Sequence, residues 1–176
     1  IMNVDHCNTH SSFKDKVYMS NLCQEITLPT KPLEHIDDPE GEIALCILSA
    51  INVGTLRDLD ELEELCELAV RALEEIIDYQ RYPIKAAEVS TKARRSLGVG
   101  YIGLAHYLAK NHVKFEDKEA WQLVHDLSEA FQYYLLKASN KLAEERGACD
   151  YFEHTKYSDG IMPIDTYKKE VDSIVE

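Results

Sequence analysis

The residues most able to do chemistry lie in one short stretch, residues 20–25, with the sequence Ser-Asn-Leu-Cys-Gln-Glu. An amide, a thiol and a carboxylate alternate there, at Asn21, Cys23 and Glu25. If the stretch is an extended strand or loop, these side chains point to one face and lie side by side along about 13 Å. A thiol can act as a nucleophile or hydrogen-atom donor, a carboxylate as a general base, and an amide can orient a substrate hydroxyl. The same alternation is also typical of a partly exposed edge strand without chemistry, so the residues alone leave both interpretations open.

A second group of chemically versatile residues precedes this stretch. Asp5, His6, Cys7 and His10 are four potential metal ligands close together in the sequence, and such a mixture can hold zinc or iron. A complete site needs further ligands, and no second His/Cys cluster has a matching spacing. We therefore favour a polar, hydrogen-bonded loop and predict no metal site.

The sequence Gly-Val-Gly-Tyr-Ile-Gly at residues 98–103 matches the G-x-G-x-x-G pattern of dinucleotide-binding folds. Such a fold requires an apolar strand before the first glycine. Residues 92–97 are instead basic and typical of a helix. The pattern therefore favours close helix packing through small residues over cofactor binding.

Composition limits the classes of partner. The chain has 19 Lys and Arg against 32 Asp and Glu, a formal net charge of −13, which disfavours binding to nucleic acid or an anionic membrane. No apolar run approaches the roughly 18 residues that span a bilayer, and the polar residues 1–10 do not resemble a secretory signal. The 5 cysteines are widely spaced without Cys-x-x-Cys, which favours free thiols in a reducing compartment. We expect a cytoplasmic protein.

The elements that must position the candidate residues differ along the chain. Residues 1–56 contain several prolines and show little helical periodicity, so we predict strands and loops there. Residues 22–28 alternate apolar and polar side chains, which predicts a strand. The continuous apolar run at residues 43–51 fits either a buried strand or a buried helical turn.

Residues 57–176 are expected to be mostly helical. Apolar residues spaced by three and four predict a first helix over about residues 59–77, with Asp58 as N-cap and Glu61 completing a capping box. A second helical region is expected over residues 86–110, with an interruption near its glycines because glycine weakens a helix.

A third and longer helix is predicted over residues 118–146. Asp117 stands where its N-cap belongs, and Gly147 should end it. At this length the helix would extend about 43 Å. A short helical stretch at residues 165–175 follows near the end of the chain.

A series of distinctive motifs runs along the whole chain in a fixed order. They comprise Asn-Val-Asp-His-Cys-Asn-Thr-His at 3–10, Ser-Asn-Leu-Cys-Gln-Glu-Ile-Thr-Leu-Pro-Thr at 20–30, Gly-Glu-Ile-Ala-Leu-Cys at 41–46, Leu-Ser-Ala at 48–50, Gln-Arg-Tyr-Pro at 80–83, Arg-Arg-Ser-Leu-Gly-Val-Gly at 94–100, Gln-Tyr-Tyr-Leu-Leu-Lys-Ala-Ser-Asn at 132–140 and Ile-Met-Pro-Ile-Asp-Thr-Tyr-Lys-Lys at 161–169. In type and order these motifs resemble the large catalytic subunit of class I ribonucleotide reductase, of the bacterial or phage type.

The resemblance implies an α/β fold. The chain would be part of the ten-stranded α/β barrel of that subunit, mostly helical here with a few strands near its N-terminus. Residues 1–176 would form one central segment of the catalytic barrel domain, with the strands and a finger loop in residues 1–56 and the helices in residues 57–176. The finger loop would carry Cys23 into the centre of the barrel.

The resemblance also implies a reaction, the reduction of ribonucleoside diphosphates to deoxyribonucleoside diphosphates for DNA synthesis by a thiyl-radical mechanism. Cys23 would become the thiyl radical and take a hydrogen atom from C3′ of the substrate. Glu25 would be the base on the 3′-hydroxyl, and Asn21 would orient the substrate by hydrogen bonding. Cys46 would be one of two thiols that reduce the 2′ position and end as a disulfide.

Several partners are implied as well. A separate, metal-containing small subunit would supply the radical, and a thioredoxin-type or glutaredoxin-type reductant would reduce the disulfide. We expect no cofactor in this segment. The second active-site cysteine, the phosphate-binding loop and the sites for nucleotide effectors would lie on the remaining segments of the large subunit.

We therefore expect a central segment, either excised or the product of a split gene, that is inactive by itself. Strand edges and a helix face that other segments normally cover would leave it marginally stable or self-associating. The alternative is a helical interaction or scaffold module without catalytic activity. Replacing Cys23 by serine distinguishes the two, because only the enzyme depends on that thiol.

Overall fold

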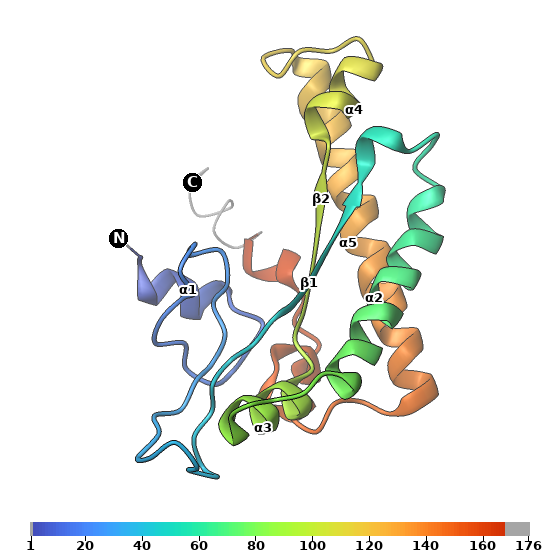
Figure 1. Ribbon diagram of the computed structural model, residues 1–176. Coiled ribbons are helices and arrows are strands. Elements are labelled where there is room, and N and C mark those ends of the chain that lie inside the picture. The colour runs from blue at the N-terminus through green and yellow to red at the C-terminus, as the bar shows by residue number, and fades with distance from the viewer. Residues whose placement is uncertain (1, 168–176) are drawn as a thin grey trace. The chain divides into compact units, whose positions relative to one another are not determined.

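The computed structural model describes residues 2–167, which form two compact units (Figure 1). The first unit comprises residues 1–46, 81–96 and 149–176, and the second comprises residues 47–80 and 97–148. Each unit therefore joins segments that are distant in the sequence. No helix among the described residues is long and apolar enough to cross a membrane.

The first unit contains little regular structure. Its helices are α1 (Val4–His10) and α3 (Lys85–Arg94), followed by the 3-10 turns η2 (Phe152–His154) and η3 (Lys156–Asp159). Two isolated antiparallel bridges, Phe13 with Thr155 and Lys31 with Glu42, connect its loops. The segments are thus joined mainly by side chains and isolated backbone contacts.

The predicted polar loop at residues 5–10 is wrong, because these residues form α1. Asn3 provides its N-cap, accepting a hydrogen bond from the His6 amide at 3.1 Å through its side-chain oxygen. The Asn8 side chain then donates to the carbonyl of Val17 at 2.9 Å and accepts from the Val17 amide at 2.8 Å. A local cap and one well-placed amide thus hold a short helix that has little apolar periodicity.

The predicted strand at residues 22–28 is also wrong. Residues 22–24 form a turn, and the chain on either side of it is irregular. The cause is local hydrogen bonding, because the Asn21 side chain accepts from the Ile26 amide at 3.1 Å. An asparagine side chain that bonds nearby backbone offers an alternative to strand pairing.

The second unit is built on a parallel pair of strands, β1 (Ile47–Asn52) and β2 (Leu97–Ile102), in register from Ile47 opposite Leu97 to Asn52 opposite Ile102. The apolar run at 43–51 therefore adopts the strand alternative from residue 47 onward, although Leu48 is exposed and the strand is only partly buried. Among the described residues the sheet has two strands and does not close into a barrel.

Helices α2 (Glu61–Tyr79) and α5 (Lys118–Arg146) pack together beside these strands, as Figure 1 shows. The 3-10 turn η1 (Val53–Thr55) follows β1, and α4 (Leu104–Lys110) follows β2. The core contains buried side chains from α2 and α5, among them Leu62, Cys66, Leu127 and Phe131. Amphipathic helices of this kind derive their stability mainly from such packing.

The helical region predicted at residues 86–110 is only partly correct. It comprises α3, strand β2 and α4, so a strand occupies the expected interruption. Helix α3 ends at Arg94, its C-cap Arg95 adopts a left-handed conformation with φ 49°, and the chain pairs with β1 from Leu97 onward. Pairing with a strand so distant in the sequence is a tertiary effect that local propensity does not report.

The G-x-G-x-x-G pattern is also explained by this arrangement. Gly98 and Gly100 lie inside β2, whereas a dinucleotide-binding loop follows its strand. Gly103 is the N-cap of α4 with φ 81°, and a Cβ there would collide with the side-chain oxygen of Asn52. The third glycine is therefore required by a close turn between β2 and α4.

The long helix predicted at 118–146 is confirmed as α5, and Gly147 follows it with φ 91°. Asp117 precedes the helix as predicted, but its side chain accepts from the Lys114 amide at 2.9 Å and makes no side-chain cap. Of the helical stretch predicted at 165–175, residues 165–167 are helical and the rest lies outside the described residues.

The start of α2 differs in part from the prediction, because the helix begins at Glu61 with Asp60, not Asp58, as its N-cap, and Asp60 makes no side-chain cap. The Asp58 carboxylate accepts hydrogen bonds from the amides of Asp60 at 3.1 Å and Glu61 at 3.2 Å. The Glu61 carboxylate accepts a hydrogen bond from the amide of Arg57 at 2.8 Å and not from that of Asp58. The expected capping box is therefore displaced by one residue.

Candidate functional site

The turn at residues 21–25 brings two of the predicted residues into direct contact. The amide nitrogen of the Asn21 side chain donates to Glu25 Oε1 at 2.6 Å. The amide of Gln24 donates to the carbonyl of Asn21 at 3.1 Å, and Gln24 adopts a left-handed conformation with φ 63°. A hydrogen bond to an ionised acceptor is stronger than a neutral one, so Asn21 orients the Glu25 carboxylate.

Cys23 lies within this turn and its side chain is exposed. The preceding Leu22 is 96% exposed, so the apex of the turn projects away from the rest of its unit. An alternating strand would have placed the three side chains on one face. The turn instead joins Asn21 to Glu25 across it and leaves the Cys23 thiol accessible between them.

Cys46 has a different environment, because it is half-buried and is the last residue of the first of the three segments that form the first unit. Burial raises the pKa of the Cys46 thiol, and the nearby negative charge of Glu25 raises it further. Both effects disfavour the thiolate, so Cys46 is a neutral thiol at neutral pH. Glu25 thus interacts with both Asn21 and Cys46, and the four predicted residues belong to one unit.

A buried charged group in the same unit was not predicted. Arg94 donates through Nε to Glu42 Oε2 at 2.8 Å, and their side chains are only 3% and 1% exposed. Arg94 also forms an ion pair with Asp15 at 2.9 Å, and Lys31 forms one with Glu42 at 2.7 Å. We call Arg94, Asp15, Lys31 and Glu42 the Arg94 cluster.

The charges of this cluster keep its carboxyl groups ionised. Burial works against ionisation of Glu42, but Arg94 and Lys31 outweigh it and lower its pKa. Burial likewise opposes ionisation of Asp15, whereas its bonds to His154 and Arg94 lower its pKa overall. The Arg-Arg-Ser motif at 94–96 could have pointed to Arg94 in the sequence, but a local motif does not indicate which distant residues form ion pairs with it.

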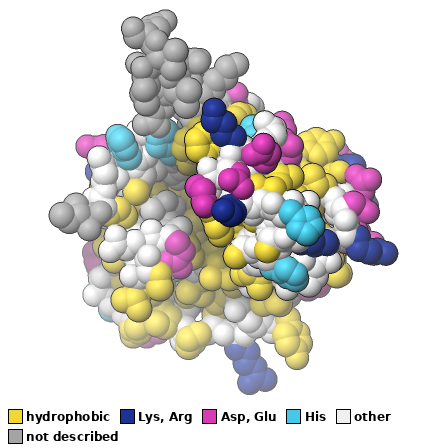
Figure 2. Space-filling model, turned by 90° about the horizontal axis from the view of Figure 1, so that it is seen from above, with side chains coloured by type: hydrophobic (Ala, Val, Ile, Leu, Met, Phe, Trp, Pro, Cys, Tyr) yellow, Lys and Arg dark blue, Asp and Glu magenta, His cyan; other side chains and the backbone are white. Residues whose placement is uncertain are grey.

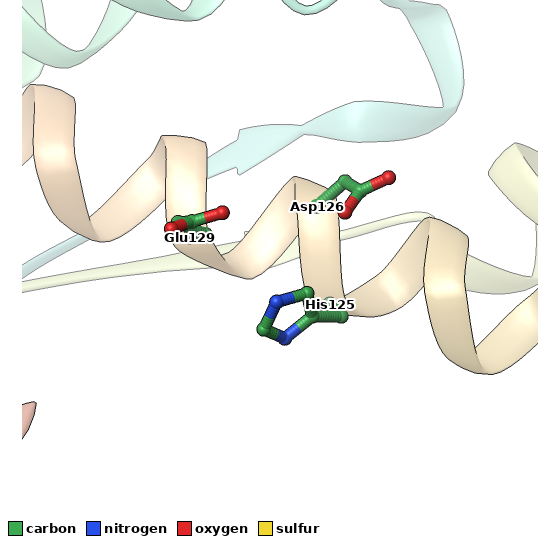
Figure 3. Close-up of side chains that lie close together, drawn as sticks. All are labelled: His125, Asp126 and Glu129. Atoms are coloured by element: carbon green, nitrogen blue, oxygen red, sulfur yellow. The ribbon is translucent and has the colours of Figure 1, made fainter.

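Two groups of residues were considered as metal ligands. Among residues 2–167, His125, Asp126 and Glu129 bring ligand atoms within 4.8 Å of one another, whereas no three of the potential ligands in α1 do so. Figure 3 shows that all three come from α5. They are exposed, and Gln122 donates to Asp126 at 2.7 Å. Exposed acidic groups on one helix do not by themselves form a metal centre.

Comparison with known proteins relates the chain to one family. The sequence model of the family described as "Ribonucleotide reductase, barrel domain" matches residues 1–174. Ribonucleoside-diphosphate reductase subunit alpha of Haemophilus influenzae is 60% identical, over 100% of this chain and 24% of that protein. Ribonucleoside-diphosphate reductase 1 subunit alpha of Escherichia coli is 58% identical, over 99% of this chain and 23% of that protein.

A more distant relative supports the same relationship. Subunit alpha of ribonucleoside-diphosphate reductase from Enterobacteria phage T4 is 43% identical over 97% of this chain and 22% of that protein. The chain thus spans about a quarter of the length of these relatives. With a family match over nearly all of its residues, the chain belongs to the ribonucleotide reductase barrel-domain family.

Proposed function

We propose that this chain is the central segment of a ribonucleoside-diphosphate reductase large subunit and supplies four residues to its active site. These are Cys23, Glu25, Asn21 and Cys46. The observation that carries the proposal is the turn that exposes the Cys23 thiol while Asn21 holds the Glu25 carboxylate at 2.6 Å. The names of the relatives supply the reaction, the reduction of ribonucleoside diphosphates.

The first step is a hydrogen-atom transfer at Cys23. The thiyl radical on Cys23 takes a hydrogen atom from C3′ of the substrate, so an S–H bond forms, a C3′–H bond breaks and the unpaired electron moves to C3′. The two bonds are similar in strength, which makes the exchange reversible. The exposed position of Cys23 at the turn allows the substrate carbon to reach its sulfur.

Glu25 and Asn21 act on the 3′-hydroxyl of the substrate. Glu25 accepts the hydroxyl proton as general base, which requires only hydrogen-bond reach of that proton. Asn21 donates to Oε1 of Glu25 and thereby fixes the orientation of this carboxylate. Asn21 also orients the substrate by hydrogen bonding.

Cys46 supplies reducing equivalents at C2′. The 2′-hydroxyl leaves as water after protonation, and Cys46 together with a second thiol from another segment gives up two electrons and two protons. An S–S bond forms, a C2′–H bond replaces C2′–OH, Glu25 returns its proton to O3′, and Cys23 returns its hydrogen atom to C3′ and regains the radical. The raised pKa of Cys46 suits this role because it keeps the proton that the reaction consumes.

The remaining parts of the system are proposed on the same basis. A metal-containing small subunit supplies the radical, and a thioredoxin-type or glutaredoxin-type protein reduces the disulfide. Effector sites lie on other segments of the large subunit, and the enzyme is cytoplasmic and makes deoxyribonucleotides for DNA synthesis. Neither nucleic acid nor a membrane is a partner.

The test is reduction of ribonucleoside diphosphates by the full-length large subunit that carries this segment, assayed with its small subunit. Cys23→Ser should abolish turnover, because serine cannot form the radical. Cys7→Ser is the matched control, since Cys7 is a half-buried thiol in α1 outside the turn, and it should leave turnover unchanged. Equal activity of Cys23→Ser and the parent would reject the proposal in favour of a module without chemistry.

A further inference from the structure

Three of the four candidate catalytic residues, Asn21, Cys23 and Glu25, lie on a long irregular loop. Residues 14–30 contain no helix or strand and lie between the two isolated bridges, Phe13 with Thr155 and Lys31 with Glu42. Val17 near the beginning of the loop and Pro29 near its end are buried, and the Asn8 side chain bonds both main-chain groups of Val17. Between them Tyr18, Met19 and Leu22 are exposed. This middle part of the loop has few buried contacts and opens easily unless the ends of the loop are held.

The beginning of the loop is held by Asp15. Its carboxylate forms an ion pair with Arg94 Nη1 at 2.9 Å and contacts Nδ1 of His154 at 2.9 Å. The Lys14 amide donates to the carbonyl of His154 at 2.8 Å. Helix α3 and the 3-10 turn η2 therefore both contact this end of the loop.

The other end of the loop is held by Lys31. Its amide donates to the carbonyl of Glu42, and the Glu42 amide donates back to the carbonyl of Lys31, both at 3.1 Å. The Lys31 ammonium contacts Glu42 Oε1 at 2.7 Å. Lys31 and Glu42 are thus joined both by main-chain hydrogen bonds and by a side-chain ion pair.

One guanidinium joins the two ends. Arg94 contacts Asp15 through Nη1 and Glu42 through Nε, and its Cζ lies 4.9 Å from the ring centroid of Tyr151 and 5.9 Å from that of Phe13. The planar guanidinium can engage two carboxylates in fixed directions while stacking on aromatic rings, which a lysine ammonium cannot.

We propose that the Arg94 cluster closes the loop and thereby positions the 21–25 turn. Arg94, Asp15, Lys31 and Glu42 are positioning residues, since they act through the loop and not on the substrate. The catalytic consequence rests on the proposed function, whereas the ordering of the loop does not.

Two mild variants test the two ends separately. Asp15→Asn weakens the first end and Lys31→Met the second, and each leaves the buried Arg94–Glu42 pair intact, so neither strands a buried charge. The matched control is Lys137→Met, which removes a lysine of similar exposure whose partner, Glu63, is itself exposed. Lys31→Arg retains the positive charge and is the rescue variant.

Hydrogen exchange and steady-state kinetics of the full-length subunit are the two measurements. In Asp15→Asn and Lys31→Met, exchange within residues 16–30 should rise by about tenfold, because each variant removes a charged contact. With the small subunit present, kcat should fall by about 10-fold to 100-fold, since small displacements of reacting groups are costly. KM should change by less than about twofold. Lys31→Arg should restore both quantities, and Lys137→Met should alter neither.

Three results would overturn the inference or separate it from the proposed function. Unchanged exchange in residues 16–30 would show that the cluster does not hold the loop. Faster exchange throughout the chain would make the effect one of global stability and reject positioning. If Cys23→Ser keeps full activity, the proposed function fails, and local exchange alone then supports or rejects loop closure.

Discussion

The cysteines of this chain differ sharply in environment. Cys23 is exposed at the apex of its turn, Cys46 is half-buried beside the charge of Glu25, and Cys66 is buried in the core between α2 and α5. Burial raises the pKa of Cys66 to about 11. Since the thiolate is the nucleophilic form, exposure should favour reaction at Cys23, whereas burial and a raised pKa should slow the reaction of Cys46 and of Cys66.

Alkylation should therefore follow the order Cys23, Cys46, Cys66 in the folded chain at neutral pH. Iodoacetamide labelling followed by peptide mass spectrometry measures the three rates, and labelling in denaturant should make them similar. Labelling of Cys66 as fast as Cys23 under native conditions would contradict the burial of Cys66.

Gly103 and Gly100 differ in environment, and this difference gives a second prediction at the scale of single residues. Gly103→Ala should destabilise the fold by at least the roughly 1–2 kcal/mol cost of a left-handed backbone, because its φ is 81° and a Cβ would collide with Asn52. Gly100→Ala is the control, since nothing lies within 4 Å of a Cβ there. Urea titration should separate the two variants, and equal free energies of unfolding would refute the requirement for glycine.

At the scale of elements, two kinds of contact join α2 and α5. Arg71 contacts both carboxylate oxygens of Glu145, at 2.8 and 2.7 Å, and also contacts Glu67 at 2.9 Å, while Leu127 is buried between the helices. Exposed ion pairs contribute little and are screened by salt, whereas removing a buried leucine side chain leaves a cavity.

Leu127→Ala should accordingly lower the free energy of unfolding by about 2–5 kcal/mol at any salt concentration. Arg71→Met should cost much less, and its effect should shrink as sodium chloride is raised. Denaturant titrations at low and high salt provide the measurement. A salt-independent effect of Arg71→Met as large as that of Leu127→Ala would reverse this ranking.

Because of the Arg94 cluster, we expect the free energy of unfolding to depend on pH in the acid range. The pKa values of Asp15 and Glu42 are lowered in the fold by the surrounding Arg94, Lys31 and His154. Because these pKa values are lower in the folded chain than in the unfolded chain, the ion pairs stabilise the fold at pH values above the ordinary carboxyl pKa of about 4. This stabilisation is lost as the pH falls below that value and the carboxylates become protonated. The Tyr151 ring also faces the cluster, with its centroid 4.9 Å from Cζ of Arg94.

The free energy of unfolding should therefore decline between about pH 5 and pH 2, and Asp15→Asn should decline less steeply. Chemical denaturation at a series of pH values measures both slopes. Identical slopes for the parent and Asp15→Asn would show that Asp15 does not contribute to the acid sensitivity.

At the scale of the whole molecule, many large hydrophobic side chains remain at the surface. Hydrophobic side chains appear among charged ones on the face seen in Figure 2. Leu48, Ile102 and Trp121 of the second unit are all more than half exposed. Exposed apolar surface of this kind promotes association.

We expect the chain by itself to self-associate and to show no reductase activity. Analytical ultracentrifugation over a range of concentrations should reveal a rising average mass, and addition of the small subunit should not produce turnover. A monodisperse monomer at high concentration, or turnover by the chain alone, would contradict the expectation that other segments complete the barrel.

Local signals in the sequence determined the long helices and the chemical candidates. Helix α5 was predicted to its bounds, since apolar spacing, a preceding aspartate and Gly147 are all short-range features. The types and spacing of Asn21, Cys23 and Glu25 made them candidates for chemistry, and the motifs along the whole chain indicated the family, which is now shown. The catalytic roles of these residues and of Cys46 stay predictions.

Tertiary structure alone decided the features that depend on distant partners. Strand β2 exists because residues 97–102 pair with β1, about fifty positions earlier in the chain. The alternation at residues 22–28 predicted a strand, but within residues 2–167 no neighbouring strand competes there with the side-chain hydrogen bonds of Asn21. The Arg94 cluster draws its charges from separate loops and a helix. Periodicity reports which face of an element is apolar, whereas pairing of strands and charges is fixed only when folding brings distant segments together.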